Sequence, residues 1–437
     1  MECSVLQYSK SLTGAVGLAL LIVVSATHAA DLARRDRYGS LRAPLTAESF
    51  AAAVLARNAS LSAMRQALVA AVSDIRPAGA LPDPMLSVSA APRTFGSATG
   101  TGEDIEVSQA LPWWGTLEVR KEIARADAEV ARHDVQALRL RLAATARAVF
   151  ADWVFVHRAL AINAANQSVI AELRRIASVR YATGKAPQAD VLQAEVAGAV
   201  LAQQRLGWQR KIAVIAARMN ALLDRPPTSP IPLPAALPAP VHLPSEAVLL
   251  QRALTHPQLK ALEAQERAAR AKVVFARKHR YPQFQVSAGY NSMWSDPAMR
   301  PTVGLSFTVP LDQDKYRAEI DAAHAQALRA EYELESERAT LLADLSAAYA
   351  SAREAAKSLA LYRDDLVPLA RDALDVALSE YGSGRGGFLE VLTAEQHQLD
   401  TELGLARTQS EYFDRWAELE RLSGSRVAIP NQTGTSP

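Results

Sequence analysis

The residues that could carry out catalysis or bind a metal do not occur in the patterns that those functions need. The sequence has no G-x-S-x-G nucleophile motif, no phosphate-binding loop and no H-E-x-x-H zinc motif. The glycine-rich segment GSGRGG at 382–387 follows a helical pattern instead of a strand, which argues against a dinucleotide-binding turn. The eight histidines form no His-x-x-x-His pair, and the single cysteine, Cys3, excludes a disulfide within the chain. We therefore expect a protein that is not an enzyme and that binds no metal or cofactor.

A set of polar residues does recur at a fixed spacing, in two segments that lie 200 positions apart. Residues 180–195 read RYATGKAPQADVLQAE, and residues 380–395 read EYGSGRGGFLEVLTAE. Both copies hold a tyrosine, a glycine, a basic and an acidic residue in the same order, which are Tyr181, Gly184, Lys185 and Asp190, and then Tyr381, Gly384, Arg385 and Glu390. Glycine after a helical pattern supplies the left-handed cap with which a helix ends. Each copy predicts a turn between two helices, and the recurrence predicts an internal duplication.

The elements around the two turns recur as well, in the order helix, β-hairpin, very long helix, turn, helix. We expect the first repeat over 31–225, with strands at about 84–91 and 103–111 and a hairpin tip at about 180–190. The second repeat is expected over 245–424, with strands at about 282–291 and 301–310 and a tip at about 380–390. Residues 226–244 contain eight prolines and predict an extended linker between the repeats, and the polar tail 425–437 is expected to be disordered.

The helical patterns are unusually long. One runs from Pro112 to about Tyr181 with apolar residues at alternating steps of three and four, which is coiled-coil spacing. A helix of that length measures roughly 105 Å, more than a compact domain accommodates. The segment from Thr46 to about Ala80 is predicted to form a single helix. A second long helix, over about 314–381, is predicted to kink at Pro368.

The N-terminus has the features of a secretory signal peptide over residues 1–30. Lys10 precedes an apolar stretch from Leu12 to Val24, and small residues lead to a cleavage site after Ala29 or Ala30. An uncleaved membrane anchor is the alternative, but the stretch is shorter than the roughly 20 residues that span a bilayer. The formal net charge of +2 gives no electrostatic reason to expect nucleic acid as a partner.

Each predicted strand has one apolar and one polar face, but four strands cannot close a barrel. Bilayer-spanning sheets must close, and known single-chain barrels begin at about eight strands, whereas three copies of this chain would supply twelve. The polar faces would then line a wet lumen, with the residues Asp104, Glu106, Ser108, Gln283, Gln285 and Thr302. Aromatic residues expected at the membrane interface are Trp113, Trp114 and Tyr281. A soluble sheet packed on helices is the alternative to this membrane arrangement.

The signal peptide, the duplicated plan and the paired Y-x-x-G-[KR] turns followed by [DE]-V-L-x-A-E resemble the TolC family of outer-membrane efflux channels. The resemblance covers nearly the whole mature chain. It implies a mainly helical fold with two structural repeats, and a homotrimer that forms a twelve-stranded outer-membrane β-barrel continued by a twelve-helix periplasmic coiled-coil tunnel. It also implies a tip that docks onto a periplasmic adaptor protein, made of Arg180, Tyr181, Gly184, Lys185, Asp190, Tyr381, Gly384 and Arg385.

The resemblance further implies a ring of side chains at the constricted entrance. The positions that hold two aspartates one helical turn apart in the family's best-known member are Glu390 and Thr393 in this chain. Three copies of Glu390 would form a carboxylate ring that favours cations, whereas Thr393 departs from the double-acid pattern.

The function implied is a passive exit duct for small toxic solutes or metal cations, located in the outer membrane of a Gram-negative bacterium with a large periplasmic part. The partners implied are outer-membrane lipids, an adaptor protein and an inner-membrane pump of the resistance-nodulation-division type. The segments PDPMLSVS (82–89) and SQALPWWGTL (108–117) resemble the subgroup that works with heavy-metal cation pumps. Two alternatives stay open, namely a protein-secretion duct of the same family and a periplasmic coiled-coil adaptor or scaffold.

Overall fold

The computed structural model describes residues 41, 43–91, 102–238, 243–294 and 296–424. The predicted signal peptide and C-terminal tail lie outside these residues. The chain divides into two compact units, of which unit 1 comprises Met1–Asn58, Thr145–Ala239 and Ser358–Phe413. Unit 2 comprises Ala59–Ala144, Pro240–Lys357 and Asp414–Pro437. Each unit therefore contains segments from both halves of the sequence.

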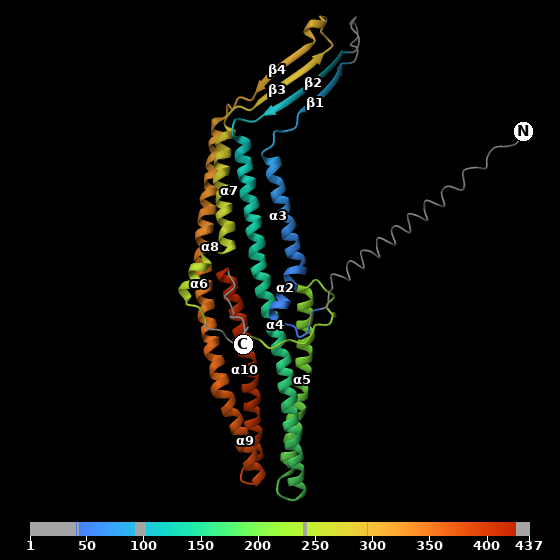
Figure 1. Cartoon of the computed structure of the whole chain (residues 1–437), viewed down its shortest axis with the longest axis vertical. Coiled ribbons are helices and arrows are strands. Elements are labelled where there is room, and N and C mark those ends of the chain that lie inside the picture. The colour runs from blue at the N-terminus through green and yellow to red at the C-terminus, as the bar shows by residue number, and fades with distance from the viewer. Residues whose placement is uncertain (1–40, 42, 92–101, 239–242, 295, 425–437) are drawn as a thin grey trace, which may run out of the picture. The chain divides into compact units, whose positions relative to one another are not determined.

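The order of elements confirms the predicted mainly helical fold with two structural repeats (Figure 1). The first half contains α2 (Ala47–Arg57), α3 (Ala59–Ala78), β1 (Met85–Ala91), β2 (Gly102–Leu111), α4 (Thr116–Ala182) and α5 (Gln188–Leu222). The second half contains α6 (Glu246–Ala253), α7 (Pro257–His279), β3 (Phe284–Asn291), β4 (Pro301–Phe307), α8 (Gln313–Leu361), α9 (Val367–Ser383) and α10 (Phe388–Ser423).

The prediction of a single helix from Thr46 to about Ala80 is wrong, because the helix breaks at Asn58. The backbone of Asn58 is extended there, with φ −60° and ψ 124°, and its Nδ2 donates to the carbonyl of Leu222 at 3.1 Å. The corresponding residue of the second half is His256, whose Nδ1 accepts the N–H of Gln258 at 3.1 Å and caps α7. Both side chains are more than nine-tenths buried; Asn58 satisfies a carbonyl at the end of α5, and His256 satisfies an N–H at the start of α7.

The predicted irregularity at Pro368 takes the form of a π-helical turn. The segment η2 (Tyr362–Leu366) separates α8 from α9 and ends just before the proline. Proline lacks an N–H and crowds the carbonyl four residues earlier, and a wider turn relieves both problems. The ring of Tyr362 lies against Gly404 of α10, where an added Cβ would come within 2.5 Å of the Tyr362 Cε1.

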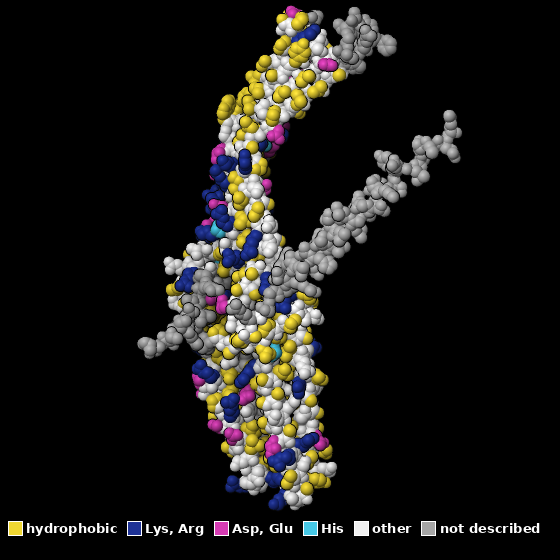
Figure 2. Space-filling model, turned by 45° about the vertical axis from the view of Figure 1, so that its right-hand side comes forward, with side chains coloured by type: hydrophobic (Ala, Val, Ile, Leu, Met, Phe, Trp, Pro, Cys, Tyr) yellow, Lys and Arg dark blue, Asp and Glu magenta, His cyan; other side chains and the backbone are white. Residues whose placement is uncertain are grey.

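The four strands form one antiparallel sheet in the order β1-β2-β3-β4. Val88 pairs with Ile105, Ile105 with Tyr290, and Val286 with Leu305, so the apolar residues of neighbouring strands lie on the same face. This apolar face is made of Leu86, Val88, Ile105, Val107, Phe284, Val286, Tyr290, Val303, Leu305 and Phe307. Val303 is 91% exposed and Leu305 67%, so the described residues leave this face uncovered. Figure 2 shows hydrophobic side chains gathered over the sheet.

The described part of the proline-rich segment, residues 226–238, forms no helix and is held by hydrogen bonds within unit 1. Leu45 donates to the carbonyl of Leu233 at 3.0 Å, and Ala235 donates to that of Leu45 at 2.7 Å. The indole nitrogen of Trp153 donates to the carbonyl of Pro232 at 3.1 Å. Prolines cannot donate such bonds, so Pro232 and Leu233 accept through their carbonyls, and the one N–H that the segment donates here comes from Ala235.

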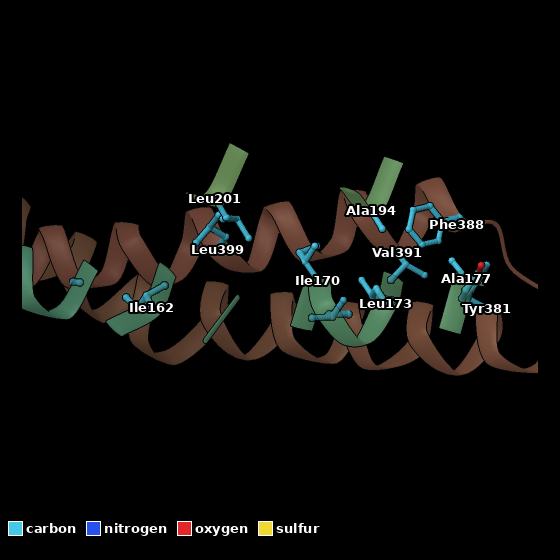
Figure 3. Close-up of a cluster of buried hydrophobic side chains, with 12 residues drawn as sticks. Ile162, Ile170, Leu173, Ala177, Ala194, Leu201, Tyr381, Phe388, Val391 and Leu399 are labelled. Carbon is cyan, nitrogen blue, oxygen red and sulfur yellow. The ribbon is translucent and has the colours of Figure 1, made fainter. Parts of the chain in front are cut away.

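Unit 1 contains a hydrophobic cluster to which α4, α5, α9 and α10 all contribute (Figure 3). Leu173 of α4, Ala194 of α5, Tyr381 of α9 and Val391 of α10 are each no more than 2% exposed. An 18-residue window of α4 is long and apolar enough to cross a membrane by length and composition alone. Within that window 39% of residues are buried, and the core helix of a packed bundle passes the same test.

We predict that Leu173→Ala lowers the free energy of unfolding by about 2–5 kcal/mol, because it removes a fully buried side chain and leaves a cavity. Loss of the helical circular dichroism signal in denaturant measures the change. Leu192→Ala on α5, where the leucine is 53% exposed, is the matched control and should have little effect. Equal losses for the two variants would contradict the assigned core.

Candidate functional site

The two recurring motifs form the same turn, for the same local reason. Gly184 and Gly384 adopt positive φ angles of 70° and 80°. Lys185 donates to the carbonyl of Arg180 at 2.8 Å, and Arg385 donates to that of Glu380 at 2.9 Å. In each turn the glycine N–H also bonds to the carbonyl of the motif tyrosine, which completes a Schellman cap. Substitution of either glycine would force another residue into the left-handed region.

Side chains from both turns meet at Tyr381, which is 2% exposed. The Tyr381 hydroxyl donates to Oδ2 of Asp190 on α5 at 3.2 Å. The guanidinium carbon of Arg180 lies 4.4 Å from the centre of the Tyr381 ring, and its Nη1 donates to the Tyr381 carbonyl. We call Arg180, Asp190 and Tyr381 the tip cluster. It joins the α4–α5 hairpin to the α9–α10 hairpin within unit 1.

The electrostatics of the tip cluster keep Tyr381 in its neutral, hydrogen-donating form. Burial, followed by the negative charge of Asp190 and the hydrogen bond to it, raises the pKa of Tyr381 to about 12. Phe388, the first residue of α10, packs beside the tyrosine with ring centres 5.4 Å apart. Sequence analysis missed Phe388, although its place in the buried series with Val391 and Leu399 is a signal that could have identified it.

The equivalent residues of the two copies occupy different environments. The Tyr181 side chain is 48% exposed, whereas that of Tyr381 is 2% exposed. Asp190 bonds to the other hairpin, whereas Glu390 bonds back to its own, because its Oε2 accepts the N–H of Gly387 at 3.1 Å. The structure thus brings together Arg180, Asp190 and Tyr381 of the predicted tip residues, and leaves Tyr181, Lys185 and Arg385 exposed.

The two residues predicted for an entrance ring lie on the exposed side of α10. Glu390 caps the first turn of the helix, where the positive end of the helix dipole favours a carboxylate. The Thr393 hydroxyl donates to the carbonyl of Leu389 at 2.8 Å and adds no charge. Both residues line a surface groove between α9 and α10 that also includes Leu369, Val376 and His397.

The polar residues predicted for a lumen share one face of the sheet. Glu106 lies opposite Ser87 and Gly289, and Ser108 lies opposite Ser287, so the polar positions align across the strands. Gln285 pairs with Ser306, and Thr302 pairs with Gly289. Gln283 immediately precedes β3, and its N–H bonds to the Thr308 hydroxyl at 3.0 Å.

The predicted interface aromatics cluster at one end of the sheet, where the strands join α4 and α7. The rings of Trp113 and Tyr281 stack with centres 4.7 Å apart, and Trp113 meets Trp114 edge-on at 4.9 Å. Phe284 of β3 completes the cluster, 6.0 Å from Trp113. Among the residues that the structure describes, histidine, cysteine, aspartate and glutamate form no group of three that could hold a metal ion.

Comparison with known sequences identifies related proteins over most of the chain. The family model described as outer membrane efflux protein matches residues 249–425. Nodulation protein T of Rhizobium leguminosarum bv. trifolii is 25% identical over 382 residues, which make up 82% of this chain and 80% of that protein.

Solved structures of outer-membrane proteins share the fold. The outer-membrane channel OprN superposes with a TM-score of 0.75 at 22% identity, and the match covers 87% of this chain and 90% of that chain. The outer membrane protein VceC of Vibrio cholerae gives a TM-score of 0.73 at 20% identity, covering 87% and 96% of the two chains. The matched family is described as outer membrane efflux protein and OprN as an outer-membrane channel, and neither description is that of an enzyme.

We predict that Tyr381→Phe weakens the contact between the two hairpins by about 1–2 kcal/mol, because it removes a hydrogen bond to a carboxylate. Amide hydrogen exchange at the turn residues 183–190 should become faster. Tyr181→Phe is the matched control and should leave exchange unchanged. A response of the same size in both variants would show that the tip cluster does not hold the hairpins together.

Proposed function

We propose that the protein belongs to the outer membrane efflux protein (TolC) family and is the outer-membrane channel component of a tripartite efflux system, in which three copies assemble into the passive exit duct. The observation that carries the proposal is the four-stranded sheet with one uncovered apolar face and one polar face. Neither nucleotide-binding nor catalytic motifs occur in the sequence, so energy has to come from the inner-membrane pump.

The outer edges of β1 and β4 support a trimer, because each is paired on one side alone in the described chain. In hydrocarbon an unpaired row of backbone N–H and C=O groups costs several kcal/mol per group. Joining β4 of one copy to β1 of the next would pair every edge. Three copies would give twelve strands, within the range of known barrels.

The two faces of the sheet suit the two sides of such a barrel. Val88, Leu305 and Val303 would contact lipid, and Asp104, Glu106 and Gln285 would contact water inside the pore. The aromatic cluster at Trp113 and Tyr281 would mark the boundary between lipid and periplasm, where aromatic rings are favoured.

The tip cluster would hold the periplasmic entrance in a closed arrangement. Arg180 and Asp190 on one hairpin contact Tyr381 on the other, through its ring and its hydroxyl. The entrance would therefore open when the two hairpins separate. The exposed cations Lys185 and Arg385 would then present charge to an adaptor protein, and three copies of Glu390 would set a preference for cations at the entrance. The proposed partner in the inner membrane is a pump of the resistance-nodulation-division type. The proposed cargo is small toxic solutes or metal cations.

We predict that Val303→Arg sharply reduces the amount of trimer in the outer membrane. A guanidinium on the lipid face costs up to about 2–4 kcal/mol near the bilayer midplane. Heat-sensitive trimers on mildly denaturing gels of outer-membrane extracts measure the effect. Thr302→Arg places the same charge on the adjacent polar face and is the matched control. The barrel proposal fails if Thr302→Arg reduces the trimer as strongly, or if the wild-type chain is a soluble monomer.

We predict that charge reversal at the tips, Lys185→Glu with Arg385→Glu, weakens cross-linking to the adaptor and raises sensitivity to exported compounds. The reason is that both cations are exposed and unobstructed beside the turns. Arg210→Glu, at an exposed position midway along α5, is the control. If Arg210→Glu raises sensitivity to the same degree, the adaptor does not bind at the tips.

A further inference from the structure

A carboxylic acid interrupts the buried face of α10. The buried residues of this face are Phe388, Val391, Glu395 and Leu399, with exposed fractions of 4%, 0%, 4% and 1%. Val391 and Leu399, one helical turn to either side of Glu395, both belong to the hydrophobic cluster of unit 1 (Figure 3). The side chain of Glu395 therefore lies in the layer where α10 packs on its neighbours.

The carboxyl group has no compensating partner for a negative charge. Its Oε1 is buried and makes no hydrogen bond to any residue that the structure describes. Moving a carboxylate out of water without a partner costs several kcal/mol, so the neutral acid is favoured. Burial, and after it the negative charge of Asp400, raises the pKa of Glu395 to about 7.

The charged groups on the helices packed around this layer do not offset that charge. Arg180 and Asp190, which contact Tyr381, and Glu402, which pairs with Arg371, are half-buried. The exposed charged residues on the same helices include Glu172, Arg174 and Arg175 on α4, Glu195 on α5, Arg371, Asp372 and Asp375 on α9, and Glu390, His397 and Asp400 on α10. Two of the basic side chains have acidic partners of their own: Arg175 pairs with Glu172, and Arg371 pairs with Glu402.

The recurring motif does not by itself require a buried acid at this position. The equivalent residue of the first copy is Glu195, which is exposed on α5. The same side chain is therefore solvated in one hairpin and enclosed in the other. Leucine or methionine would fill the enclosed position without the cost of a buried polar group.

We propose that Glu395 is a proton-sensitive lock on the packing of α10 against α4, α5 and α9. The neutral acid stays enclosed and keeps the hairpins together. The ionised acid drives α10 away from the cluster until water reaches the carboxylate. The lock itself depends on the packing of unit 1 alone. Its consequence for conduction is a channel that opens as pH rises, and this consequence rests on the proposed function.

The direction follows from the raised pKa in the packed state. Below about pH 4.5 the acid is neutral in both arrangements, and the packed one has its full stability. As pH rises toward 7, the opened arrangement loses its proton first, so the packed one is progressively destabilised. Between about pH 5.5 and pH 8 the ratio of opened to packed chains should rise roughly 30-fold.

The test compares the full-length trimer with Glu395→Gln, which keeps the shape of the side chain but cannot ionise. Amide hydrogen exchange of residues 388–399 is measured for both proteins at about pH 5.5 and pH 8, and the wild-type rate is divided by the variant rate at each pH. This ratio cancels the intrinsic effect of pH on exchange. Glu395→Met replaces the glutamine variant if that protein does not assemble, and Glu195→Gln is the matched control.

We expect the ratio to rise at least tenfold toward pH 8 for Glu395→Gln and to stay near one for Glu195→Gln. A ratio that does not change with pH, or an equal change for Glu195→Gln, overturns the proposal. Conductance in planar bilayers separates the two levels of inference. A pH-dependent exchange ratio without any conductance supports the lock and contradicts the proposed channel, whereas normal conductance with a constant ratio contradicts the lock.

Discussion

Backbone hydrogen bonding is the constraint on which this structure depends. A strand in water can leave one edge unpaired, since water satisfies its N–H and C=O groups, but a strand in hydrocarbon cannot. The sheet of this chain has an uncovered apolar face and two outer edges, on β1 and β4. An apolar face favours lipid, and lipid in turn requires the edges to be paired. A single four-stranded chain would expose either its apolar face to water or its unpaired edges to lipid, whereas neighbouring copies would pair those edges within lipid.

The parts of the fold that the sequence could predict are those set by residues close together in the chain. Alternation along a strand has a period of two, so the face of each residue follows from its parity once the strand is recognised. Asp104, Glu106 and Gln285 were assigned to one face on that basis, and the register places them there. The two turns were predictable for a related reason, because a glycine cap depends on residues within one turn of helix, as at Gly184 and Gly384.

Features that depend on distant partners could not be read from the sequence. Asn58 breaks a helix because its side chain bonds to the end of α5, 164 residues away in the chain. His256 does so at the matching place, where its Nε2 lies 3.0 Å from the carbonyl of Arg421. These two residues occupy corresponding places in the two halves, but asparagine and histidine are common in helices and loops alike. Only the tertiary contacts distinguish a break from an ordinary polar position.

Duplication hides the most important difference between the two halves. Local rules treat Tyr181 and Tyr381, or Glu195 and Glu395, as equivalent, because each pair occupies the same position in the repeated motif. In the folded chain the second member of each pair is enclosed and the first is exposed. The enclosed tyrosine has an acidic partner at 3.2 Å, whereas the Oε1 of the enclosed glutamate has no hydrogen-bond partner among the described residues. In the proposed channel, the enclosed carboxyl of Glu395 would lower the free energy of parting the second hairpin from the first, because it packs less favourably than an apolar side chain.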